Sequence, residues 1–223
     1  MNSFTLFNAL AVSALVSLSA CSASEAQQVR QVNSFETVKV SGAVDLYLRQ
    51  GSTTEVKVDA APEVLEYIKT EVSGNTLTIY RDKKFSLSDL MRNKPVKVYV
   101  TTPKLSGIEV SGACDVKGET PIKSDDFRIS ASGASDVTLT LNANSVSTDA
   151  SGASDIRLDG RVERQRVQIS GSSDYRASDL RSDKANINAS GASDAYVYVD
   201  EELSSHSSGA SDIRNKGKAH SSR

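Results

Sequence analysis

The chain has 223 residues, of which 38% are hydrophobic, 24% charged and 5% aromatic, and its formal net charge is −2. A chain of this length builds one domain or two small ones, and its near balance of charge argues against a nucleic-acid partner because no basic field holds phosphates. Two His and two Cys residues are too few for a Cys/His zinc cluster.

The N-terminus carries an export signal. Residues 6–20 form an uncharged, largely apolar run that is too short to span a bilayer and leads into the lipobox-like tetrapeptide Leu-Ser-Ala-Cys. We therefore expect a signal peptide over residues 1–20 and a lipidated tether over residues 21–29 that begins at Cys21. Because no Lys or Arg precedes the apolar run, cleavage after Ala26 without lipidation is the alternative. Either route predicts an exported envelope protein, and lipidation predicts an outer-membrane lipoprotein.

Residues 30–105 predict a less regular β region at the start of the domain. Alternating apolar and polar residues predict strands within 35–49, 55–59, 76–80 and 96–100. A short helix is predicted over 62–69, with Pro62 in its first turn. Ser73-Gly74-Asn75 predicts a turn, and the mixed charge of residues 81–94 predicts an excursion from the sheet.

A five-residue motif repeats through residues 106–217. Ser-Gly pairs followed by Asp recur at steps of 21, 19, 19, 20 and 18 residues, and the flanking residues alternate between apolar and polar. Each copy therefore predicts two short strands, buried on one face and joined by a Ser-Gly corner. This period fits one turn of a β-solenoid. We predict an all-β fold, a right-handed parallel β-helix with rungs of about 19–20 residues, followed by a polar tail over 218–223.

The corners carry a glycine column and an aspartate column. Glycine permits a positive φ, and Ser and Asp side chains can satisfy backbone N–H groups that a turn leaves unpaired. A calcium ladder along the aspartates is the alternative, but we favour the turn role and expect no metal and no cofactor. The columns are Gly112, Gly133, Gly152, Gly171, Gly191 and Gly209, with Asp115, Asp136, Asp155, Asp174, Asp194 and Asp212.

Cys114 stands where most other copies of the motif have Ser. We therefore expect it to be a small packing residue, with a reactive or intermolecular thiol as the alternative. Once the N-terminal Cys21 is assigned to the anchor, Cys114 has no second cysteine with which to form an internal disulfide.

Outward positions beside the aspartate column carry Arg and Tyr. Guanidinium groups and aromatic rings in stacked columns can bind an anionic or sugar-rich polymer through forked hydrogen bonds and ring stacking. The simpler alternative is that the arginines neutralise the neighbouring aspartates. The candidate binding residues are Arg157, Arg176, Tyr196, Tyr198 and Arg214.

The order of these pieces resembles a known family. The pieces are a Val-rich strand leading into Ser41-Gly42, then Val56-x-Val58, then Thr76-Leu77-Thr78-Ile79, and finally the repeated corners. Over residues 30–213 they resemble the bacterial exported proteins that carry the putative auto-transporter adhesin head GIN domain. The resemblance implies an exported β-helical domain, assigned to residues 30–217 and often found on lipoproteins. It implies no catalytic residues.

The sequence contains no complete nucleophile elbow, no HExxH motif and no phosphate-binding glycine loop. We therefore predict a non-catalytic envelope protein whose solenoid serves adhesion or polysaccharide binding. Its expected partners are polysaccharide or another envelope component, and the membrane through the lipid anchor. The alternative is a carbohydrate-active β-helix enzyme, a lyase or hydrolase, with paired carboxylates from the aspartate column.

Overall fold

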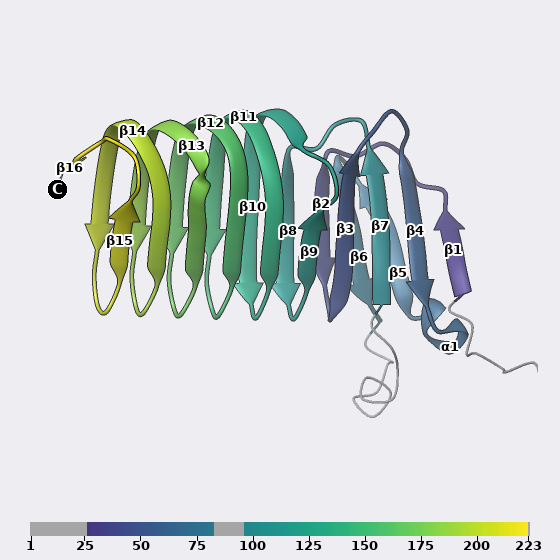
Figure 1. Ribbon diagram of the computed structural model, residues 1–223. Helices are drawn as coiled ribbons and strands as arrows, with labels where there is room; N and C mark the ends of the chain where they lie inside the picture. Colours follow the sequence, from purple (N-terminus) through teal and green to yellow (C-terminus); the bar gives the residue numbers. More distant parts are fainter. Residues whose placement is uncertain (1–25, 83–95, 223) are drawn as a thin grey trace, which may run out of the picture.

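The computed structural model describes residues 26–82 and 96–222 (Figure 1). Stacked parallel strands form a β-solenoid of about 5 turns, which confirms the predicted fold class. The stack has two sheet faces. The front face holds β1, β4, β7, β3, β9, the first halves of β11 to β14, and β15. The back face holds β5, β6, β2, β8, β10, the second halves of β11 to β14, and β16.

Long strands that bend from the front face to the back face build the regular part of the stack. These strands are β11 (Asp136–Ala150), β12 (Asp155–Ile169), β13 (Asp174–Ala189) and β14 (Asp194–Ser207). The turns before and after them comprise β8 (Gly107–Gly112), β9 (Asp115–Gly118), β10 (Ile122–Gly133), β15 (Asp212–Asn215) and β16 (Ser221–Ser222). The register aligns equivalent residues, because Asp136 pairs with both Asp115 and Asp155. Residues at the same position in successive copies of the repeat are therefore neighbours in adjacent strands, either on the surface or in the core.

The N-terminal part extends both faces with a mixture of parallel and antiparallel strands. Its elements are β1 (Ala26–Arg30), β2 (Thr37–Ser41), β3 (Val44–Gln50), β4 (Glu55–Ala60), α1 (Pro62–Leu65), β5 (Ile68–Ser73), β6 (Thr76–Arg81) and β7 (Val96–Thr102). Strands β6 and β7 stack outside β2 and β3, and the chain then crosses back over that rung to begin β8. Antiparallel β4 and β1 complete the front face and antiparallel β5 completes the back face.

Three local expectations differ from the structure. The helix ends at Leu65, and Ile68 instead begins β5 because its buried side chain joins the core. Residues 26–29 of the expected tether lie in β1, which pairs with β4, and residues 221–222 of the expected tail form β16. Most of the expected excursion over residues 81–94 lies outside the described residues.

The core of the described part of the chain is a continuous apolar column that encloses a polar network. In β11 the inward residues Val137, Leu139, Leu141 and Val146 are buried. The network lies between β12 and β13 and consists of the buried side chains of Tyr175, Gln165 and Ser182. The Tyr175 hydroxyl donates to Gln165 Oε1 at 2.8 Å, and Gln165 Nε2 donates to Ser182 Oγ at 2.9 Å. Burial raises the pKa of Tyr175, which keeps its hydroxyl protonated as a donor.

The corner glycines are required by backbone contact between rungs. Gly152 has φ +84°, and a Cβ added to it would lie 2.5 Å from Gly133 O. The close approach exists because the N–H of Ala153 donates to the same carbonyl at 2.8 Å. An L side chain at the corner therefore meets both an unfavourable φ and a steric collision.

We predict that Gly152→Ala destabilises the domain more than Gly74→Ala. Gly74 also has a positive φ, but a Cβ there would meet no atom within 4 Å. The Gly74 variant should cost about 1 kcal/mol for backbone strain, and the Gly152 variant about 1–3 kcal/mol more for overpacking. Denaturant unfolding of both variants measures the difference. Equal losses would contradict the role given to the contact between rungs.

Candidate binding face

The second serine of the corner motif, directly before the aspartate, points inward, and its hydroxyl contacts the backbone. Ser135, Ser154, Ser173 and Ser193 are fully buried. The Ser135 hydroxyl lies within hydrogen-bonding distance of two carbonyl oxygens, Ser132 O at 3.1 Å and Gly112 O at 3.2 Å, which share its one proton. Ser173 Oγ accepts from the N–H of Ser154 at 3.3 Å. The buried Cys114 occupies the same column, and burial raises the pKa of its thiol. Its position is that of a packing residue.

The aspartate column instead points outward beside the corners. In the described part of the chain, one carboxylate of the column accepts a hydrogen bond from a backbone donor: the N–H of Asp212 donates to Asp194 Oδ1 at 3.2 Å. Arg176 lies 2.7 Å from Asp174 and 3.7 Å from Asp155, and Arg214 lies 2.8 Å from Asp212. These ion pairs are largely solvent-exposed, so each contributes little to the stability of the fold. The arginine charges offset the electrostatic repulsion between carboxylates of adjacent rungs.

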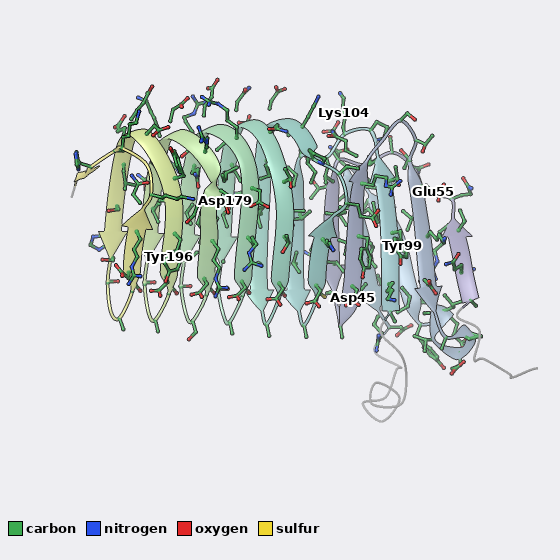
Figure 2. All side chains as sticks on the ribbon, viewed as in Figure 1. Asp45, Glu55, Tyr99, Lys104, Asp179 and Tyr196 are labelled. Atoms are coloured by element: carbon green, nitrogen blue, oxygen red, sulfur yellow. The ribbon has the colours of Figure 1, made fainter. Side chains whose placement is uncertain are left out.

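One outward row crosses the front face from the N-terminal strands to the C-terminal end. The register pairs each of its members with the next: Lys57, Tyr99, Tyr47, Lys117, Thr138, Arg157, Arg176, Tyr196 and Arg214. We call these nine residues the front-face row. Figure 2 shows Tyr99 and Tyr196 far apart along the stack, with Asp45 nearer the corners. Adjacent strands lie about 4.8 Å apart, so the row presents cations and rings at that interval.

The structure brings Arg157, Arg176, Tyr196 and Arg214 together in this row, as the repeat predicts. Arg214 lies over the Tyr196 ring, with its Cζ 5.6 Å from the ring centroid. Arg157 has no carboxylate within salt-bridge distance among the described residues. The charge pairing considered as the simpler alternative therefore applies to Arg176 and Arg214 and leaves Arg157 free to meet a ligand.

Tyr198 has a different neighbour from the one that simple counting gives. Because Tyr196 pairs with Arg176, Tyr198 would pair with Ser178 if the register continued unchanged. It pairs instead with Arg181. The cause is a bulge in β13 that buries Leu180 and turns Asp179 outward. Arg181 lies over the Tyr198 ring, with its Cζ 5.2 Å from the ring centroid. Tyr198 remains on the front face but stands outside the front-face row.

The N-terminal half of the row is absent from the sequence-based candidates. Tyr47 and Tyr99 stack with ring centroids 4.8 Å apart and planes 17° apart, and Lys57 lies 5.8 Å from the Tyr99 centroid. These strands lack the complete corner motif on which the repeats were aligned. The alternation of β3 and β7 marks both tyrosines as outward residues, but only their pairing places them in one row.

A groove of about 380 Å³ adjoins Tyr47 on the front face. Its polar lining comes from Asp45, Tyr47, Asp115, Lys117, Asp136 and Thr138. Partial burial, followed by the charge of Asp115, raises the pKa of Asp45, and Lys97 opposes this shift. The groove is therefore an acidic hollow bounded by an aromatic ring.

Two further predictions concern the lipid anchor and metal binding. Cys21 lies outside the described residues. Within residues 26–82 and 96–222, no three His, Cys, Asp or Glu side chains are grouped to hold a metal ion. The same part of the chain contains no helix long and apolar enough to cross a membrane.

The comparison with protein families matches residues 34–219 to the family described as "Putative auto-transporter adhesin, head GIN domain". The chain belongs to this family. The match covers β2 to β15, so the GIN domain includes the irregular N-terminal strands as well as the regular rungs, and only β1 and β16 of the described strands lie outside it.

Solved structures similar to this GIN domain share its fold. A putative adhesin from Bacteroides fragilis NCTC 9343 is 19% identical, with a TM-score of 0.79 over 90% of this chain and 98% of that one. A putative adhesin from Parabacteroides distasonis ATCC 8503 is 20% identical, with a TM-score of 0.70 over 89% and 92%. A putative lipid binding protein from the same strain is 16% identical, with a TM-score of 0.65 over 89% and 97%. No curated protein matches the sequence significantly.

We predict that Asp45→Asn raises the melting temperature at neutral pH. A raised pKa in the folded state means that folding disfavours the ionised carboxylate, so ionisation costs stability as the pH rises. The gain should vanish in acid below the unfolded-state pKa, where the carboxyl group is protonated in both states. Thermal unfolding across this range measures the effect. As a control, Asp212→Asn removes an ion pair with Arg214 and should give no gain. A gain that persists in acid would contradict this assignment.

Proposed function

We propose that the protein is a non-catalytic, exported adhesin-type protein that binds extracellular polysaccharide along the front-face row. The observation that carries the proposal is the continuity of that row across both halves of the solenoid. A rigid sheet with cations and rings at regular intervals suits an extended polymer, because each sugar can meet the same kinds of groups in turn. Membership of an adhesin-type family and the names of two similar structures support the adhesin part of the proposal.

We predict that Arg157→Gln weakens binding to a polysaccharide, identified on a glycan array, by about tenfold, because a forked charge-assisted contact is lost. The matched control is Arg166→Gln. Arg166 is also an exposed arginine of β12, but it faces outward on the back face. Affinity is measured by calorimetry or surface binding, and melting temperatures verify that both variants fold. Equal affinities of the two variants would contradict a front-face site.

The carbohydrate-active enzyme is the second candidate, and one observation favours it. Asp45 and Asp115 interact in the groove, and the pKa of Asp45 is raised, as a general acid requires. Release of reducing ends or unsaturated sugars from a bound polymer would establish this activity. Its loss in Asp45→Asn, with polymer binding retained, would assign it to the groove.

We also propose that Cys21 anchors the protein to the cell envelope through a lipid. The support is the uncharged apolar run followed by the lipobox-like tetrapeptide that ends at Cys21. We predict that metabolic labelling with a fatty acid marks the wild-type protein and fails for Cys21→Ala. An unlabelled mature protein that begins at Gln27 would instead indicate ordinary cleavage.

A further inference from the structure

The groove beside Tyr47 differs from the rest of the front face in shape. It lies over β9, which has four residues and is flanked by β3 and β11. Thr138 is a short side chain between Lys117 and Arg157 in the front-face row, so the surface is low at this point. The groove is thus part of the front-face row, at the position where the row has the short side chain of Thr138.

Tyr47 offers one aromatic face to this groove. Its other face is covered by Tyr99, because β3 lies between β7 and β9 in the sheet. Among the described residues, no cation–π contact and no second ring stack is made on the groove side of Tyr47, where its cross-strand neighbour is Lys117. An exposed ring face at the wall of a polar groove is the surface on which the C–H face of a sugar ring packs.

The groove carries more negative charge without an ion-pair partner than the C-terminal half of the front face does. Asp115 and Asp136 have no salt-bridge partner among the described residues, whereas Asp155 and Asp174 share Arg176. The groove holds three carboxylates and a single ammonium group, that of Lys117. It therefore repels a polyanion, and a bound cation would relieve the repulsion between neighbouring carboxylates.

We infer that this groove binds a polysaccharide that carries primary amines, such as a polymer of glucosamine with free amino groups. One sugar ring packs on Tyr47, and its ammonium group lies between Asp115 and Asp136, which are paired in adjacent strands about 4.8 Å apart. This inference rests on the proposed function and names the ligand class for the N-terminal half of the front-face row.

The test compares three soluble probes: glucosamine oligosaccharides with free amines, their N-acetylated counterparts, and a polyuronate. The free-amine probe should bind at least about tenfold more tightly than the other two. The Asp115→Asn, Asp136→Asn double variant and the Tyr47→Ala variant should each lose about tenfold of this affinity. Added salt should weaken the binding, because it screens the contact between ammonium and carboxylate.

Two controls match these variants on the back face. Asp149→Asn removes a carboxylate from the other end of β11, and Tyr80→Ala removes a tyrosine from β6. Both should retain wild-type affinity for the free-amine probe. Melting temperatures of all variants separate lost binding from lost folding.

Several results would overturn the inference. One is equal binding of the acetylated probe, and another is full affinity in the Asp115, Asp136 double variant. Competition by polylysine that does not depend on Tyr47 would indicate a general cationic surface contact, and loss of binding on chelation would indicate a metal bridge. If another polysaccharide binds through Arg157 while the amine probe does not, the proposed function stands and the inference fails. If no polysaccharide binds, both fail.

Discussion

The hydrogen-bond ladder between rungs continues through the corners, and the rest of the structure depends on it. From the corner at Gly133 to the corner at Gly209, the residue after the glycine donates its N–H to the glycine carbonyl of the previous rung, as Ala153 does to Gly133 and Ser172 does to Gly152. Backbones that approach this closely leave no space for a Cβ. The glycine therefore recurs at these corners, while the outward positions of the same rungs are free to vary.

A ladder in constant register also places like residues on like residues. This is favourable for the apolar columns of the core, which become one continuous interior. It is unfavourable for the aspartate column, because carboxylates of adjacent rungs stand about 4.8 Å apart. The C-terminal rungs reduce this cost with Arg176 and Arg214 in the neighbouring row. The N-terminal rungs lack such partners at Asp115 and Asp136, and the acidic groove lies there.

The repeat allowed most of the regular rungs to be predicted, because residues one period apart become spatial neighbours. Counting failed at Tyr198, since the bulge around Asp179 and Leu180 shifts the pairing within the rung. The step between the corners of this rung is 20 residues after two steps of 19, but the spacing alone does not show where in the rung the added residue lies. Counting along the repeat also could not place Tyr99 beside Tyr47. Strand β7 is inserted between β3 and β4, which are joined directly in the chain, and no local pattern specifies this order. The aromatic half of the front-face row follows from tertiary pairing alone.

Because the rungs are near copies of one another, more than one order of stacking could satisfy the corners, and the buried polar network favours one of them. Since the corners have almost the same sequence, two rungs could join out of step by one full period and still form most corner hydrogen bonds. The hydroxyl of Tyr175 meets the amide of Gln165 only when β13 follows β12. A misaligned stack would bury that amide among apolar side chains, at a cost of about 1–3 kcal/mol. The network thus marks one rung as unique, and it favours a single frame among assemblies whose backbones are nearly equivalent.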